Sequence, residues 1–449
     1  MRSSCFRSLF AVLSCFFACS LFGAAEPSIV SVEQLSDRTV EITYLLEEAS
    51  AVVTLRVQTN NSENVWIDIP GAMLRSLSGD VNRLVEAGGR AKVVRWRPGS
   101  EEFVSEMNLS NMRFVVTAWP VDDPPPYMVV SLAKKSDPRA RYYPSADSLP
   151  GGLLTRNCYR TDMLVMRKIP AKNVTWIMGA KGESGWMDGV GAEKPHQVTL
   201  AANYYIGVFP VTQRQWANVA GDAHHAWHDG TGRNSLRAME YCSFYELRES
   251  PISEYASGKT GGSSNSNCRY PNAPSPNSFL GLLRARTGID FDLPSEAQWE
   301  YACRAGHGYG FYGDGSAIGA ANLARIACFG RGASSDPAVD PASGGTPIVG
   351  SSEPNDFGIY DMNGCVWEYC IDYFASDITG ETMADGGPNA NGGYLVSDPS
   401  KTGWQHIRRG GGYDSDAGSC RPAFRYNNID PNTRASNTGV RVVCPGIAH

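Results

Sequence analysis

The sequence has no run of basic residues and, beyond its first 25 residues, no long apolar run. Lys and Arg number 40 against 46 Asp and Glu, which gives a net charge of -6. Nucleic acids and anionic membrane surfaces attract clustered positive charge, so we expect neither as a partner. A membrane-spanning helix needs ~20 consecutive apolar residues, so we expect none after the N-terminus.

Zinc-type Cys-x-x-Cys pairs are also missing. Nine cysteines follow residue 25, namely Cys158, Cys242, Cys268, Cys303, Cys328, Cys365, Cys370, Cys420 and Cys444. An odd number leaves at least one thiol unpaired or bonded to another chain. We expect a mixture of disulfides and buried thiols in preference to a zinc site.

Long stretches of helical periodicity are scarce, whereas glycine (47) and proline (27) are frequent. This composition predicts short elements joined by many loops and argues against a helical bundle. A chain of 449 residues exceeds one ordinary hydrophobic core, so we expect two or three domains.

Residues 1–25 have the pattern of a signal peptide. Arg2 and Arg7 precede an apolar run over residues 9–22, and small residues follow up to Ala25. We predict cleavage after Ala25 and export to the periplasm, the cell surface or the medium, where disulfides can form. A lipoprotein anchored through Cys19 is the alternative, although bulky residues precede that cysteine.

Residues 27–120 alternate apolar and polar positions in short runs, at 40–44, 53–57, 65–69, 93–94 and 114–116. Turn residues separate these runs, so we predict a small antiparallel β-sandwich of the fibronectin or immunoglobulin kind. Three prolines at 124–126 end the pattern. Residues 121–160 are therefore predicted to be a proline-rich linker and an irregular connector.

Residues 161–446 mix short strands with capped helices. Strands are predicted over residues 164–170, 174–179 and 196–200. Capping-box patterns, which start helices, occur at Thr212 with Gln215 and at Ser295 with Gln298. A further helix is predicted from about Ser235 to Arg248, followed by a surface insertion over residues 250–277.

Residues 355–373 concentrate carboxylates, asparagines and glycines around a tryptophan, a mixture that fits neither an amphipathic helix nor a strand. Asp361 and Glu368 supply hard oxygen ligands, and Gly364 lets backbone carbonyls turn inward, as in many calcium sites. A loop with solvated charges around a core tryptophan is the alternative.

Five blocks within residues 163–445 occur in the same order as in the formylglycine-generating enzyme, or sulfatase-modifying factor, family, which this part of the chain resembles. The blocks are residues 169–179, 193–212, 293–302, 361–369 and the closing segments 409–413, 420–425 and 437–441. The resemblance implies an α+β, C-type-lectin-like fold with little regular secondary structure, preceded here by the small all-β domain.

The resemblance also implies two structural calcium sites. The first would use the side chains of Asp361 and Glu368 and the backbone oxygens of Gly364 and Val366. The second would begin at Asn322 and the carbonyl of Leu323, with further ligands in residues 330–340, where Asp336 and Asp340 are the candidates.

In the family's enzymes, two cysteines bind copper(I) while a substrate cysteine is oxidised to formylglycine. The first of these positions holds Ser415 here. Cys420 occupies the second position when residues are counted without a gap, but matches a disulfide cysteine when Ala423 and Arg425 are aligned. Neither alignment leaves a thiolate pair, and a serine hydroxyl is a poor ligand for copper(I), which argues against the copper-dependent reaction. Ser415 and Cys420 therefore lie where the family has its active site, but we assign neither residue a catalytic role.

The remaining cysteines and histidines receive structural interpretations. By position, the resemblance implies the disulfides Cys303–Cys420 and Cys242–Cys444. The family's iron-dependent branch uses a histidine triad, and the one histidine cluster of this chain comprises His224, His225 and His228. Glycines flank that cluster, so we interpret it as a solvated loop in preference to a metal site.

Three functions follow from these observations. The first is an exported homologue that acts as an enzyme on a partner polypeptide. The second is a module that displays residues 413–419 and 426–430 to a protein or glycan ligand, as the variable proteins of diversity-generating retroelements do on this fold. The third is a structural surface protein. The missing thiol pair favours the second and third, and the oligomeric state is left open.

Overall fold

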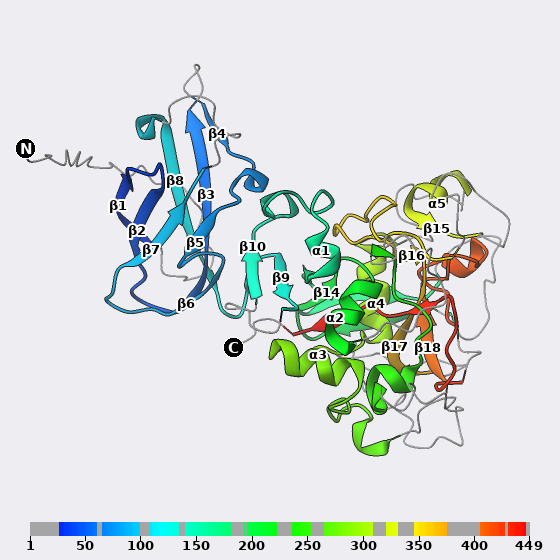
Figure 1. The fold of residues 1–449 in the computed structure, drawn as a ribbon. Helices are drawn as coiled ribbons and strands as arrows, with labels where there is room; N and C mark the ends of the chain where they lie inside the picture. The colour runs from blue at the N-terminus through cyan, green and yellow to red at the C-terminus, as the bar shows by residue number, and fades with distance from the viewer. Residues whose placement is uncertain are drawn as a thin grey trace, which may run out of the picture.

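The computed structural model (Figure 1) describes residues 27–60, 65–98, 108–133, 140–180, 193, 195–221, 236–252, 265–308, 320–330, 345–374, 405–426 and 430–445. The predicted signal peptide, the histidine cluster at 224–228, Asp336 and Asp340 lie outside these residues.

Two antiparallel sheets form the N-terminal domain (Figure 1). The first has the strand order β1-β2-β7-β5, and the second has the order β4-β3-β6 with β8 paired to β3. The strands are β1 (Ser28–Gln34), β2 (Val40–Leu45), β3 (Ala51–Asn60), β4 (Trp66–Asp68), β5 (Leu77–Gly79), β6 (Arg83–Val85), β7 (Lys92–Trp96) and β8 (Met112–Pro120).

One hydrophobic core joins the two sheets. Alternate residues of β2, among them Ile42, are buried in the same cluster as Leu55 of β3 and Trp96 of β7. This period of two is what a strand with one buried face produces. The all-β character predicted for this region is confirmed, while its assignment to the fibronectin or immunoglobulin kind stays a prediction.

The second domain begins earlier than its predicted strands. β9 (Tyr127–Ser131) and β10 (Ala140–Tyr143) lie in the segment predicted to be an irregular connector, yet they extend the five-stranded sheet β10-β9-β11-β14-β20. The other strands are β11 (Met163–Ile169), β14 (Tyr204–Gly207) and β20 (Val443–Cys444). The first four residues of β9 are all buried, so the strand lacks the alternation that signals a half-exposed strand.

Small sheets and short helices complete the second domain. The strands are β12 (Val174–Met178), β13 (His196–Leu200), β15 (Ala327–Cys328), β16 (Asn363–Gly364), β17 (Trp367–Tyr373), β18 (His406–Arg409) and β19 (Thr438–Gly439). The helices are α1 (Cys158–Thr161), α2 (Gln213–Ala220), α3 (Phe279–Thr287), α4 (Glu296–Arg304) and α5 (Ala320–Ile326). The predicted α+β fold with little regular secondary structure, preceded by an all-β region, is confirmed.

Two helices begin at the residues that the sequence predicts. Both capping boxes form, at Thr212 for α2 and at Ser295 for α4. Helix α3 was not predicted from the sequence, although Ser278 caps its start. Within the described part of the chain, we find no helix with the length and apolarity that a membrane crossing requires.

The helix predicted from about Ser235 to Arg248 is wrong. The described residues form a π-helical turn only over Tyr245–Glu249, and the segment before it is extended. There the backbone makes isolated bridges, from Ala238 to Thr212 and from Arg237 to Ile348. Its backbone hydrogen bonds therefore go to neighbouring segments instead of to its own turns.

Candidate functional site

Glu368 of β17 is buried in the second domain, with 1% exposure. Its Oε2 accepts a hydrogen bond from Trp299 Nε1 of α4 at 2.6 Å. Both carboxylate oxygens accept from Arg441 Nε at 3.0 Å, and Arg441 Nη2 lies 2.8 Å from Oε1. The negative charge of Glu368 is thus compensated by a guanidinium group, as a buried carboxylate requires.

Asp361 precedes β16 with a left-handed backbone, at φ 60°. Its Oδ2 accepts from the backbone N–H of Gly350 at 2.6 Å. Burial raises the pKa of Asp361 to about 6, although the bond from Gly350 and the nearby Arg441 guanidinium act to lower it. Asp361 and Glu368 therefore occupy one buried polar centre that also holds Arg441.

The first predicted calcium site places Asp361, Gly364, Val366 and Glu368 along one buried turn. Calcium takes six to eight oxygen ligands, so each carboxylate must be available to it. The oxygens of Glu368 already accept from Trp299 and Arg441, and a cation beside them would be repelled by the guanidinium group. Glu368 as described does not fit a calcium ligand, and calcium stays a prediction for this turn.

The second predicted calcium site lies only partly within the described residues. Leu323 is fully buried in α5, where it packs with Ile326, Ala327 and Cys420. Asn322 lies in the same helix. Across the described ranges, His, Cys, Asp and Glu side chains form no group of three or more that could hold a metal ion.

Ser415 closes a tight turn after β18. Its Oγ accepts from the backbone N–H of Gly412 at 2.9 Å, and its own N–H donates to the Gly412 carbonyl at 3.0 Å. The Ser415 carbonyl accepts from Gly330 at 2.8 Å. Gly411 has φ 79°, and a Cβ there would lie 2.6 Å from Cys420 Sγ, so this turn requires glycine.

Cys420, at the end of the 3₁₀ turn Gly418–Cys420, is fully buried. Asn363 Nδ2 donates to its carbonyl at 2.8 Å, and the thiol of Cys303 donates to Asn363 Oδ1 at 3.8 Å. Burial raises the pKa of the Cys420 thiol, and the nearby Asp416 raises it further. A buried, protonated thiol is a poor metal ligand and a poor nucleophile.

The structure differs from the predicted disulfides Cys303–Cys420 and Cys242–Cys444. All nine cysteines beyond residue 25 are described, and Cys242, Cys303, Cys420 and Cys444 form no disulfide with one another. Cys242 donates to the carbonyl of Thr438 at 3.5 Å, and Cys303 is directed at Asn363. The family resemblance predicted disulfides for these cysteines, but in the structure the thiols of Cys242 and Cys303 contact Thr438 and Asn363 instead.

The sequence interpretation missed a buried network of charges beside this site. Glu296 of α4 pairs with Arg409 Nη2 at 2.6 Å and with Arg425 Nε at 2.5 Å, while Glu300 pairs with Arg409 and Arg304. Burial acts to raise the pKa of Glu296, but Arg409 and Arg425 lower it to about 2. The sequence feature that could have predicted this network is the presence of arginines within otherwise apolar segments, because buried charges are nearly always paired.

Loop residues 413–419 lie beside the aromatic rings of Trp367 and Tyr426. We call these residues together the loop face. Asn437 Nδ2 donates to both carboxylate oxygens of the exposed Asp414, at 3.0 and 3.1 Å, while the Asn437 carbonyl accepts from Trp367. Trp367 stacks on the half-buried Tyr426 with ring centroids 4.5 Å apart. The Arg408 guanidinium lies 4.8 Å from the Tyr426 ring. The loop face thus combines exposed carboxylates with an anchored aromatic ring.

Comparison with known proteins places this chain among relatives. A family model described as "Sulfatase-modifying factor enzyme 1-like domain" matches residues 165–445. The chaperone protein LppX of Paenibacillus barcinonensis is 26% identical over 260 residues, which cover 55% of this chain and 81% of LppX. The formylglycine-generating enzyme of Streptomyces coelicolor is 33% identical over 158 residues, covering 33% of this chain and 45% of the enzyme.

The match to the curated enzymes is partial. The formylglycine-generating enzyme of Mus musculus is 30% identical over 158 residues, or 38% of its length, so the chain spans less than half of either enzyme. Among solved structures, Treponema denticola variable protein 1 aligns with a TM-score of 0.44 and 24% identity over 63% of this chain and 95% of that one. PvdO from Pseudomonas aeruginosa aligns with a TM-score of 0.44 and 21% identity over 63% and 94%.

Proposed function

The chain belongs to the sulfatase-modifying factor enzyme 1-like family, and from this premise we propose that it is an exported ligand-binding protein that does not oxidise cysteine with copper. The observation that carries the proposal is the use of Ser415 within the fold. Its hydroxyl accepts from Gly412 inside a tight turn, at the position where the resemblance places the first copper-binding cysteine.

The chemistry of the neighbouring thiol supports the same conclusion. Copper(I) selects soft thiolate ligands, and a serine hydroxyl is a hard donor. Cys420 is buried, and that burial raises the pKa of its thiol, so it does not offer a thiolate at neutral pH. One protonated thiol and one hydroxyl do not make a linear copper(I) site.

The proposed binding surface is the loop face. Asp414 and Asp416 are exposed there, and Asn437 holds Asp414 in place. Polar side chains on anchored loops, with a tyrosine ring nearby, suit adaptable recognition of a protein or glycan. Export remains part of the proposal and rests on the N-terminal pattern of Arg2, Arg7 and the apolar run after them.

Two measurements test the proposed function. The mature protein is incubated with copper, oxygen, a reductant and a peptide that carries a Cys-x-Pro-x-Arg sequence, with a formylglycine-generating enzyme as the positive control. We expect no mass loss at the peptide cysteine. A mass loss that requires this protein would overturn the proposal and favour the enzyme.

The binding arm uses glycan and peptide arrays probed with the wild-type protein. We expect any hit to weaken in Asp414→Asn and Tyr426→Ala, which alter the loop face. Asp68→Asn is the matched control, because it removes a half-exposed carboxylate in the N-terminal domain, outside the loop face. In the wild type this carboxylate pairs with Arg56. Binding that both domains' variants weaken equally would exclude the loop face as its site.

A further inference from the structure

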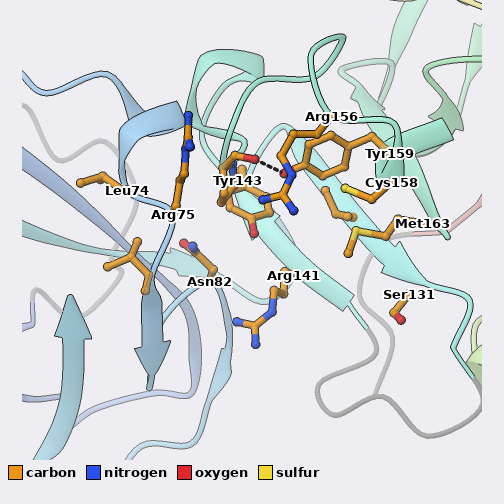
Figure 2. Close-up of a pocket in the computed structure, with 13 residues that line it drawn as sticks. Leu74, Arg75, Asn82, Ser131, Arg141, Tyr143, Arg156, Cys158, Tyr159 and Met163 are labelled. Atoms are coloured by element: carbon orange, nitrogen blue, oxygen red, sulfur yellow. Dashed lines mark hydrogen bonds between the residues drawn. The ribbon is translucent and has the colours of Figure 1, made fainter. Parts of the chain in front are cut away.

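A crevice of about 270 Å³ lies between the two domains (Figure 2). The N-terminal domain contributes Leu74, Arg75, Leu77 and Asn82, and the second domain contributes residues of β9, β10, α1 and the segments between β10 and β11. Backbone hydrogen bonds join the two walls, from Tyr142 to the Asn82 carbonyl and from Gly151 to the Ala72 carbonyl, each 2.8 Å long. The crevice is therefore fixed on both sides.

The lining of the crevice is basic. Arg75, Arg141 and Arg156 line it, and none of the lining residues is Asp or Glu. Across the described residues, the side chains of Arg141 and Arg156 make neither an ion pair nor a hydrogen bond. Two uncompensated guanidinium groups in one crevice create a positive potential that attracts an anion.

The position of Arg156 depends on a glycine. A Cβ at Gly151 would lie 2.3 Å from Arg156 Cδ, so the aliphatic part of the arginine occupies space that only glycine leaves open. Figure 2 shows the Arg156 side chain extending beside the ring of Tyr159. The Tyr159 hydroxyl donates to the Pro150 carbonyl at 2.9 Å, which fixes that ring. Arg156 is thus held along the wall of the crevice by its surroundings.

Two neutral polar groups line the crevice and have no hydrogen-bond partner among the described residues. Asn82 is 5% exposed and Tyr143 is 6% exposed. Neither the side-chain amide of Asn82 nor the Tyr143 hydroxyl makes a hydrogen bond with any described residue, and both residues line the crevice. Burial raises the pKa of Tyr143 to about 12, so its hydroxyl stays protonated and can donate. Both groups can therefore hydrogen-bond a ligand that enters the crevice.

We propose that this crevice binds a small molecule bearing a phosphate or sulfate group. The donors come from separate elements: Asn82 from the N-terminal domain, Arg141 and Tyr143 from β10, and Arg156 from the segment before α1. A tetrahedral oxyanion offers acceptor oxygens in several directions, whereas a carboxylate offers two in one plane. The volume exceeds that of the bare ion, so an ester with a small organic group fits.

Calorimetry with inorganic phosphate, inorganic sulfate and O-phosphoserine, at constant ionic strength in chloride, tests the proposal. Acetate serves as the carboxylate comparison. We expect saturable binding of at least one tetrahedral oxyanion and weaker binding of acetate. Binding of acetate as tight as that of every phosphate and sulfate probe, or no binding of any probe, would overturn the proposal.

Variants locate the site. Asn82→Asp keeps the size and left-handed backbone of a residue with φ 55° but adds a negative charge, so we expect it to abolish binding. Arg141→Gln should raise Kd at least about tenfold, because a charge-assisted pair is lost. Arg95→Gln, which removes a half-exposed guanidinium group of the same domain outside the crevice, should leave Kd within about twofold.

Cys158 gives an independent readout that does not depend on heat of binding. It lines the crevice, and it is the one cysteine of the nine that is not buried. We expect the bound probe to slow alkylation of Cys158 by a maleimide in the native protein, and Asn82→Asp to remove this protection while its circular dichroism and melting temperature show that it is folded. Equal protection in wild type and Asn82→Asp would place the anion elsewhere.

Discussion

Ser415 Oγ lies 2.9 Å from the backbone nitrogen of Gly412 and accepts its hydrogen bond. Gly412 is buried, so this N–H depends on a protein partner. The position that would supply a copper ligand in the family's enzymes therefore supplies a turn in this chain.

Ser415→Ala should lower stability by about 1–3 kcal/mol, because it leaves the buried N–H of Gly412 without its acceptor. Thermal or urea unfolding measures the change. Ser419→Ala is the matched control in the same loop, since the Ser419 hydroxyl makes no hydrogen bond with any described residue. Equal effects of the two substitutions would show that the Gly412 bond contributes nothing.

Ser415→Cys should not create a copper(I) site. A second thiol at this position would need Cys420 as the other ligand of the family's pair, and that side chain is buried against Gly411. Competition with a chromophoric copper(I) chelator measures the affinity of the variant. A tight complex that disappears when Cys420→Ser is added would contradict both this prediction and the proposed function.

Glu368→Ala should destabilise the protein by about 3–5 kcal/mol, because it leaves the Arg441 guanidinium buried and unpaired. The buried ion pair predicts the same loss in calcium-containing buffer and in chelator, as measured by melting temperature. Glu353→Ala is the control, since that carboxylate pairs with Arg325 at the solvent-exposed surface and its loss should change the melting temperature little. A loss confined to calcium-containing buffer would instead assign Glu368 to the predicted ion.

Asp372 should make stability fall as pH rises from about 4 to about 7. Burial, aided by the neighbouring Glu296, raises the pKa of Asp372 to about 7, while an aspartate in the unfolded chain titrates near about 3.9. The folded state therefore keeps a proton that the unfolded state has released, so this stabilisation is complete below about pH 4 and is lost as pH passes 7.

Asp372→Asn keeps an acceptor for the Glu296 N–H, which Asp372 Oδ2 accepts at 2.6 Å, and removes the titration. The variant should gain stability relative to wild type between pH 4 and pH 7, by about 1.4 kcal/mol for each pH unit in that range. Urea unfolding across this pH range measures the difference. A stability difference between variant and wild type that stays constant across this pH range would show that Asp372 is ionised in the folded protein throughout. Asp290→Asn, at the surface, is the control.

Peptide mapping and alkylation of the thiols can decide whether the predicted disulfides form or whether these cysteines stay reduced, as in the structure. The structure predicts that peptide mapping of unreduced protein finds neither Cys303–Cys420 nor Cys242–Cys444. It also predicts that native alkylation modifies Cys158 first, because the other eight thiols are buried. Recovery of either predicted bond from protein purified without oxidant would restore the assignment made from the family resemblance.

The sequence by itself determined the features that depend on local patterns. The alternation in residues 40–44 predicted β2, because a strand with one buried face repeats every two residues. Thr212 with Gln215 and Ser295 with Gln298 predicted the starts of α2 and α4, because a capping box needs only four consecutive residues. The ordered blocks predicted the family.

Only the tertiary structure decided the groups that meet across long separations. Glu368 and Arg441 are 73 residues apart, and Asn82 shares a crevice with Arg141 although a predicted linker separates them. β9 and the extended segment around Ala238 gave misleading signals because their backbones pair with distant segments. Ser415 is where the two kinds of information meet. Its identity argued against a thiolate pair, and its bond to Gly412 gives the serine a structural role in the turn.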